Sequence, residues 1–315
     1  MNASRIFATW VWIALTLLLV SGCDRQGSEA RKVSLADTVT QEKEVTPEAT
    51  GNQLRVAVAA ILSPQASFTA YRDMLAYLER RLSMPVHLVQ RRTYKEVNEL
   101  LGENRLDMAF VCTGAYVIEG SKHGMELLVA PVVQGEPVYY SYVITRQGTG
   151  IERFTDLEGK SFAFSDPLSN TGYFAPRCML GDRKKNPDRF FSRTIFTHSH
   201  DGSVEAVAKG LVDGAAVDSL VFDALAESEP DLVRELRIIE RSAPFGIPPV
   251  VVSRAVEQET RDRLRNLLLG MHEDPEGKKI LSSLRIDRFV KVDDSLYDSV
   301  RDMYEKMDIA GMDAE

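Results

Sequence analysis

The chain of 315 residues lacks several features that mark large functional classes. It has three cysteines, no His-x-x-x-His spacing with a third ligand, no Gly-x-x-x-x-Gly-Lys loop and no Gly-x-Ser-x-Gly motif. These absences argue against a metal site, a P-loop and a hydrolase nucleophile elbow, and neither a metal nor a cofactor is expected. No block of basic residues occurs and the net charge is −8 at pH 7, so nucleic acid is an unfavourable partner.

An apolar run near the N-terminus predicts a targeting segment. Arg5 precedes the apolar run Ile6 to Val20, which is shorter than the roughly 20 residues that a transmembrane helix needs. The following Ser21-Gly22-Cys23 resembles a bacterial lipobox, so residues 1–22 are predicted to be a lipoprotein signal peptide and Cys23 its lipidation site. The alternative is an ordinary signal peptide with a chance cysteine. A lipidated Cys23 would place the protein on the periplasmic side of the cell membrane, and Asp24 resembles the residue that keeps some lipoproteins in the inner membrane.

A polar segment separates this leader from the fold. Residues 23–52 are rich in Gln, Ser, Thr, Glu, Lys and Asp, which is typical of a flexible tether. The remaining 260 or so residues are enough for two domains of ordinary size.

Strands and helices alternate through the rest of the chain, which predicts an α/β fold of parallel sheets with helices on both faces. The pattern restarts after the β-prone segment 138–145, and a second crossing falls near Pro248. We therefore expect two lobes around a cleft, with lobe I formed by residues 53–143 and 248–315 and lobe II by residues 144–247. Ligands of such sheets bind at the carboxyl ends of the strands.

One turn has the composition of an anion site. Asp166-Pro167-Leu168-Ser169-Asn170-Thr171-Gly172 follows the apolar strand 161–165 and precedes a helix over 173–180. The free N–H groups of a helix start, its dipole and small hydroxyl side chains together favour an anion. The alternative is an ordinary helix cap, which Ser and Asn also favour.

Several motifs occur in a fixed order along the chain. The lipobox is followed by Asp107-Met108-Ala109-Phe110 with Tyr116, by the Asp-Pro-x-Ser-x-Thr-Gly turn, by Ser199-His200-Asp201 and by the strand end Gly214 to Asp218. Together they resemble the phosphate, phosphite and phosphonate-binding components of ABC transporters, a branch of the type II periplasmic solute-binding proteins. The resemblance covers about residues 54–290, and the turn is its most specific part.

The resemblance implies a two-lobed clamp that closes on a small phosphorus oxyanion and delivers it to ABC permease subunits. It also implies the groups that hold the ligand. These are Ser169, Asn170, Thr171 and Gly172 of the turn, His200 as a further donor, Tyr71 from lobe I and Asp218 after a small strand. In phosphonate binders an acid near that last place meets a ligand amino group or takes a proton from the oxyanion. Asp166 is expected to fix the turn by bonding its own backbone.

The loop after residue 111 departs from the resemblance. Many family members have Gly-Pro or Gly-Asn there, whereas this chain has Cys112-Thr113-Gly114. Thr113 and Gly114 remain candidate donors, but the departure leaves the anion's identity open. Cys112 and Cys178 are expected to be unpaired thiols, because two distant cysteines provide no disulfide framework.

Two other functional readings remain. Ser169, His200 and Asp218 occur in an order known for hydrolase triads, but the nucleophile elbow is missing, so no enzyme activity is expected. The same clamp would serve a sensory protein coupled to a membrane kinase, or bind another small anion or organic solute. The protein is expected to act as a monomer tethered to the membrane through Cys23.

Overall fold

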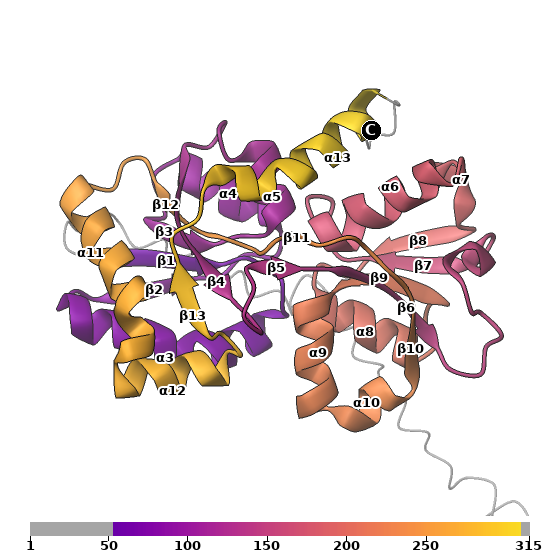
Figure 1. Ribbon diagram of the computed structural model, residues 1–315, viewed down its shortest axis with the longest axis horizontal. Coiled ribbons are helices and arrows are strands. Elements are labelled where there is room, and N and C mark those ends of the chain that lie inside the picture. The colour runs from indigo at the N-terminus through magenta and orange to yellow at the C-terminus, as the bar shows by residue number, and fades with distance from the viewer. Residues whose placement is uncertain (1–52, 310–315) are drawn as a thin grey trace, which may run out of the picture. The chain divides into compact units, whose positions relative to one another are not determined.

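The computed structural model describes residues 53–309 (Figure 1). The predicted signal peptide, Cys23 and the tether lie outside the described residues. Within the described part of the chain, no helix has both the length and the apolar character needed to cross a membrane.

A six-stranded mixed sheet forms the first part of the fold, which we call lobe I. Its strand order is β13-β4-β12-β3-β1-β2. Strand β1 runs parallel to β2 and β3, whereas β12 runs antiparallel to β3 and β4, and β13 antiparallel to β4. The strands are β1 (Leu54–Val58), β2 (Val86–Val89), β3 (Met108–Phe110), β4 (Met125–Val132), β12 (Val250–Ser253) and β13 (Arg288–Val290).

Helices cover both faces of this sheet because its central strands are apolar on both sides. In β1, Val56 packs in the same cluster as Met74 of α3, whereas Ala57 packs with Val97 of α4. Helix α4 begins with a capping box in which Thr93 and Glu96 satisfy each other's free N–H groups. The helical segments of lobe I are α3 (Pro64–Leu82), α4 (Tyr94–Gly102), α5 (Thr113–Glu119), α11 (Gln258–Gly270), η3 (Met271–Glu273) and α12 (Pro275–Ser283).

A five-stranded mixed sheet forms the second part, lobe II, with strand order β10-β6-β9-β7-β8. Strand β7 runs parallel to β8 and β9, and β6 runs antiparallel to β9 and β10. The strands are β6 (Ser141–Arg146), β7 (Ser161–Phe164), β8 (Arg193–Phe196), β9 (Gly214–Asp218) and β10 (Leu236–Arg241). The helical segments are η1 (Phe154–Leu157), η2 (Asn170–Phe174), α6 (Ala175–Asp182), α7 (Pro187–Phe190), α8 (His200–Ala208), α9 (Ser219–Ser228) and α10 (Pro230–Arg234).

Aromatic side chains fill one face of lobe II. Phe162 of β7 stacks on Phe191 with ring centroids 4.2 Å apart, and Phe154 and Phe164 surround this pair. Such rings bury large apolar areas and hold β7 rigidly in the sheet. The turn that follows β7 therefore starts from a fixed point.

Two extended segments connect the lobes. Strand β5 (Val138–Tyr139) pairs antiparallel with β11 (Phe245–Gly246) in a small separate sheet between the two large ones (Figure 1). The chain then returns to lobe I and ends in η4 (Asp294–Tyr297) and α13 (Asp298–Ile309). Helix α13 carries Val300 and Met303 into the aromatic cluster of lobe II, so it packs against both lobes.

The α/β class and the alternation expected from the sequence are confirmed, but the expectation of parallel sheets is wrong for both lobes. Each sheet receives strands that return from the other lobe, β6 after the first crossing and β12 after the second, and both run antiparallel to their neighbours. The expected boundary after residue 143 falls inside β6, which begins at Ser141, whereas residue 248 lies just before β12.

Candidate functional site

The polar turn Asp166–Gly172 follows β7 and winds directly into a helix. Asp166 Oδ1 accepts the N–H of Leu168 at 2.8 Å, which fixes the turn as expected. Ser169 caps the helix, because its Oγ accepts the N–H of Gly172 at 3.0 Å. The first helical turn is wide, with the Phe174 N–H bonded to the Ser169 carbonyl oxygen five residues earlier at 3.0 Å. Ser169, Asn170 and Thr171 are completely buried.

Buried polar atoms without hydrogen-bond partners gather at this turn. Thr171 Oγ1 and Asn170 Oδ1 have none, and neither does the buried phenol oxygen of Tyr94. Leaving such a group buried and unpaired costs about 1–3 kcal/mol, so several of them at one turn indicate a place built for a polar ligand.

Lobe I closes over the polar turn at the start of α5. A Cβ atom added to Gly114 would lie 2.4 Å from the Leu168 carbonyl oxygen and 2.8 Å from the Asn170 nitrogen. The backbone N–H groups of Asn170 and Gly114 both face the Cys112 thiol and act to lower its pKa. Burial has the larger effect and raises the pKa of Cys112 to about 11. Cys112 is therefore a neutral thiol in contact with both lobes.

Thr113 reaches the hinge rather than the turn. Its hydroxyl donates to the Gly246 carbonyl oxygen at 2.8 Å. The expected donor at this position is thus already engaged with β11, although Thr113 lies in the same buried region. Cys112 and Cys178 are both unpaired, as expected.

His200 lies behind the polar turn and bonds protein groups with both ring nitrogens. Its Nδ1 accepts the backbone N–H of Asp218 at 3.0 Å, which places the ring proton on Nε2. Nε2 faces Ser169 Oγ at 3.4 Å and Ser165 Oγ at 3.5 Å. Burial lowers the pKa of His200 to about 3, so the ring is neutral at pH 7.

This arrangement is not a hydrolase triad. In a triad the carboxylate binds the Nδ1 proton and Nε2 accepts the serine proton. Here the backbone of Asp218, and not its carboxylate, bonds to Nδ1, so His200 has the opposite tautomer and Nε2 has no lone pair to take the proton of Ser169. Among the described residues, no group of three or more His, Cys, Asp or Glu side chains is placed to hold a metal ion.

Asp218 caps helix α9 from the end of β9. Its Oδ1 accepts the N–H of Leu220 at 2.7 Å. The residue is buried, and desolvation raises the pKa of the carboxyl to about 7 despite this hydrogen bond. Burial raises the pKa of the phenols of Tyr71, Tyr94 and Tyr139, and the negative charge of Asp218 adds to this rise, so the three rings lie around Asp218.

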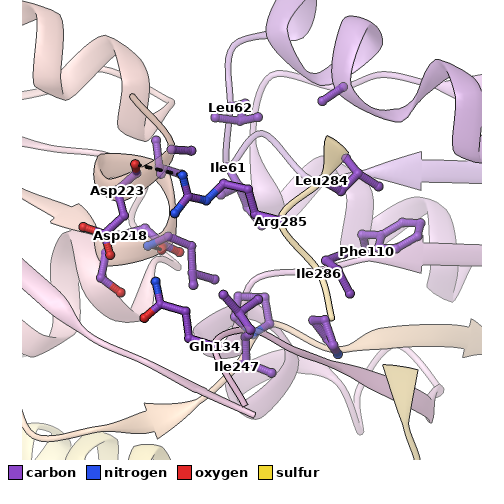
Figure 2. Close-up of a pocket in the computed structure, with 18 of the residues that line it drawn as sticks. Ile61, Leu62, Phe110, Gln134, Asp218, Asp223, Ile247, Leu284, Arg285 and Ile286 are labelled. Carbon is purple, nitrogen blue, oxygen red and sulfur yellow. Dashed lines mark hydrogen bonds between the residues drawn. The ribbon is translucent and has the colours of Figure 1, made fainter. Parts of the chain in front are cut away.

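A cavity of about 340 Å³ lies between the lobes beside Asp218 (Figure 2). Tyr71 lines it with its ring against Phe110, at a centroid distance of 4.9 Å, and burial raises the pKa of Tyr71 to about 12. Tyr71 and Asp218 are the two expected site residues in its wall, whereas Ser169 to Gly172 do not line it. The structure therefore brings the expected residues into one region, but only two of them line the cavity.

Three hydrogen bonds tie the lobes together around the site. Asp166 Oδ2 accepts the N–H of Tyr94 at the start of α4 at 3.2 Å. The Asp201 carboxylate accepts the N–H of Ser63, before α3, at 2.9 and 3.1 Å. The backbone N–H of His200 donates to the Ile61 carbonyl oxygen at 3.0 Å. The structure is thus a closed clamp, in which two carboxylates beside the polar turn and His200 bind helix starts of lobe I.

Sequence reasoning missed Tyr94 and the bridging role of Asp201. Tyr94 could have been found from its place in the sequence. It directly follows Thr93 and starts a helix after β2, and in sheets of this kind ligands bind at the ends of the strands where such helices begin.

Comparisons with known proteins agree on one family. A family model described as "ABC transporter, phosphonate, periplasmic substrate-binding protein" matches residues 56–297. The phosphonates-binding periplasmic protein of Escherichia coli is 23% identical over 236 residues, which are 73% of this chain and 70% of that protein. The phosphate-import protein PhnD of Mycolicibacterium smegmatis is 26% identical over 239 residues, 72% of this chain and 74% of that protein.

A solved structure shows the same fold. The binding protein component of an ABC phosphonate transporter from Pseudomonas aeruginosa superposes with a TM-score of 0.78 at 22% identity, covering 82% of this chain and 88% of that one. The two-lobed fold expected from the sequence is confirmed, and so is the family resemblance.

Replacing Gly114 by alanine should keep the lobes apart. The added methyl group would meet backbone atoms of Leu168 and Asn170, which cannot move aside cheaply, whereas nothing opposes it while the lobes are separated. Small-angle scattering should show a larger radius of gyration than for the parent protein, with unchanged helix content. Gly270→Ala is the matched control, because a Cβ there has no atom within 4 Å. A Gly114→Ala protein as compact as the parent would contradict the contact.

Asp218 should lower the free energy of unfolding as the pH rises from about 4 to 7, against the rise that His200 contributes over the same range through its lowered pKa. The carboxyl has a folded pKa of about 7, above its unfolded value, so the folded state holds this proton more tightly. Its contribution is complete below the unfolded pKa and is lost as the pH rises through 7, a change of a few kcal/mol at roughly 1.4 kcal/mol per unit of pKa shift. Urea unfolding at several pH values should show that the free energy of unfolding of the parent, minus that of Asp218→Asn, decreases by a few kcal/mol from pH 4 to pH 7. An unchanged slope in this variant would contradict the shift.

Proposed function

The chain belongs to the family of periplasmic substrate-binding proteins of ABC phosphonate transporters, and from this premise we propose that its polar turn captures a small phosphorus oxyanion: a phosphonate, phosphite or phosphate. The family comprises solute-binding transport proteins that bind a small ligand and work with permease subunits, and it is not an enzyme family. The observation that carries the proposal is the buried, unpartnered hydroxyl of Thr171 at a helix start.

The donors at the turn match the chemistry of a tetrahedral oxyanion. The Thr171 hydroxyl is available at a helix start, where the helix dipole favours a negative charge, and hydrogen bonds to a charged oxygen are about twice as strong as neutral ones. Ser169 Oγ already accepts the Gly172 N–H and faces the His200 Nε2–H, so its own proton is left to donate to the ligand. His200 thus acts as a positioning residue for Ser169.

Closure accounts for retention of the ligand. The bonds from Asp166 to Tyr94 and from Asp201 to Ser63 form only when the lobes meet. Closure also excludes water from the turn, which strengthens the hydrogen bonds to the anion. Ligand binding and the inter-lobe bonds therefore favour the same conformation.

Related proteins support both phosphonate and phosphate as ligands. The E. coli relative carries the name phosphonates-binding protein, and the M. smegmatis relative the name phosphate-import protein. In our proposal the protein is a monomer that delivers its ligand to an ABC permease from the periplasmic side of the membrane.

Calorimetry with phosphate, phosphite, methylphosphonate and 2-aminoethylphosphonate tests the ligand class. At least one should bind tightly, and Thr171→Val should weaken that ligand by about 1.5–3 kcal/mol, the value of a hydrogen bond to a charged group. Without ligand, the free energy of unfolding of Thr171→Val should equal or exceed that of the parent protein, because the Thr171 hydroxyl has no hydrogen bond to lose.

Thr145→Val is the matched control for this substitution. Thr145 is equally buried in lobe II, but its hydroxyl donates to the Asp213 carbonyl oxygen at 2.7 Å. This variant should lose stability and keep its affinity. Absence of binding to all four anions, and to sulfate and nitrate, would refute the oxyanion proposal, and unchanged affinity in Thr171→Val would locate the site elsewhere.

We further propose that Cys23 carries a lipid anchor. Cys23→Ala should move the protein from the membrane fraction to the soluble periplasmic fraction, because the modified residue supplies the only anchor in the proposal. Asp24→Ser, next to the same cysteine, is the control that leaves lipidation intact. A Cys23→Ala protein that still pellets with membranes would refute lipid anchoring.

A further inference from the structure

The wall of the inter-lobe cavity has an apolar part and a charged part. Most of its apolar side chains come from lobe I, which also contributes Arg285 and Glu136, and lobe II contributes Asp218, Asp223 and Arg241. Figure 2 shows Asp218 and Asp223 opposite Leu284 and Ile286. The apolar part of the wall includes Ile61, Leu62, Phe110, Leu284 and Ile286. A cavity of about 340 Å³ falls within the range of small-molecule sites and exceeds what an inorganic oxyanion fills.

Two of the charged side chains in the wall already have partners. Arg285 reaches across from lobe I to donate to the Asp223 carbonyl oxygen at 3.2 Å and pairs with Glu227 at 2.5 Å (Figure 2). The Asp218 carboxylate caps α9. These two side chains close and shape the cavity.

Arg241, Asp223 and Glu136 are the charged side chains of the wall without a hydrogen-bond or ion-pair partner among residues 53–309. Arg241 and Asp223 both come from lobe II. Arg241 is held in place, because it stacks over the Tyr140 ring at 3.7 Å from the centroid, and Tyr140 also lines the cavity. Burial raises the pKa of the Asp223 carboxyl, and the positive charges of Arg285 and Arg241 act against this rise, so both guanidinium groups lie near it.

We propose that this part of the cavity is a second subsite that binds an α-amino acid group on the ligand's organic substituent, with the carboxylate on Arg241 and the ammonium on Asp223. The inference rests on the proposed function, since the polar turn would hold the phosphorus end. The ligand class is then a phosphonate joined through a short apolar linker to an amino acid group. The linker lies against the apolar wall of lobe I.

Helix α9 separates the two acidic side chains of the wall along its axis. Asp218 caps this helix, and Asp223 follows five residues later, a rise of about 7.5 Å. The amino acid group at Asp223 is therefore joined to the phosphorus end by a linker of several carbon atoms. A guanidinium that stacks on an aromatic ring has its N–H donors in one fixed plane. A carboxylate in that plane can accept two parallel hydrogen bonds, one on each oxygen.

Ligands that carry only one of the two charges satisfy half of the subsite. An amine alone would leave Arg241 unpaired, and a carboxylate alone would leave Asp223 unpaired. Because each charge favours an opposite partner at close range, the zwitterionic end group is the one that the wall complements.

Four phosphonates with matched carbon skeletons test the subsite by calorimetry. They are butylphosphonate, 4-aminobutylphosphonate, 5-phosphonopentanoate and 2-amino-5-phosphonopentanoate. We expect the amino acid compound to bind at least 100-fold more tightly than butylphosphonate, and each singly charged compound to fall between them. Arg241→Gln should abolish the gain from the carboxylate, and Asp223→Asn the gain from the amine, with butylphosphonate affinity unchanged in both.

Arg237→Gln is the matched control, because Arg237 lies on the same strand but pairs with Glu152 outside the cavity. Its affinities should equal those of the parent protein. If butylphosphonate binds and the end groups add nothing, or if the gains persist in Arg241→Gln and Asp223→Asn, the subsite is refuted and the proposed function stands. If no phosphonate binds, methylphosphonate included, the proposed function fails as well.

Discussion

The close approach of Gly114 to the polar turn is the constraint on which the closed arrangement depends. With no Cβ at this position, the start of α5 reaches the backbone of Leu168 and Asn170. That contact seals Ser169, Asn170 and Thr171 away from water and brings Cys112 against the N–H of Asn170. Once water is excluded, every unpaired donor at the turn carries a free-energy cost, and a ligand that pairs them stabilises the closed state.

Residues of the polar turn and of the segment after His200 also hold the lobes together. Asp166 belongs to the polar turn and bonds Tyr94 of lobe I, and Asp201 follows His200 and bonds Ser63. Both carboxylates accept N–H groups at helix starts, where free donors and the helix dipole favour a negative charge. Any change that shifts the polar turn therefore also shifts an inter-lobe bond, which couples occupancy to closure without a separate trigger.

The parts of the site that are local in sequence could be predicted, and those that depend on long-range packing could not. The strand over 161–165, the Asp166 turn and the Ser169 cap follow from neighbouring residues, and all three are present. The tautomer of His200 depends on a backbone N–H eighteen residues away, and the partner of Asp166 is seventy-two residues away. Short elements such as α5 and β13 also escaped prediction, because three to seven residues carry little periodicity.

The direction of the return strands was missed for a related reason. A buried apolar strand such as Val250 to Ser253 has the same composition whether its neighbours run parallel or antiparallel. Its direction is set by the point at which the chain re-enters the lobe from β11, and that is a property of the hinge. Composition thus identifies the strand, and connectivity decides its orientation.

Recognition of the two ends of the ligand has a different basis in the chain. The phosphorus end would meet consecutive residues of one turn, whose geometry is fixed by Asp166, Ser169 and the aromatic core beneath β7. The cavity beside it is assembled from both lobes, from Ile61 near the start of the fold to Ile286 near its end. Substitutions in the cavity wall can therefore alter the accepted substituent without disturbing the turn. In the proposed function the turn would therefore select the oxyanion class, whereas the identity of the whole ligand would depend on side chains such as Arg241 that no local motif marks.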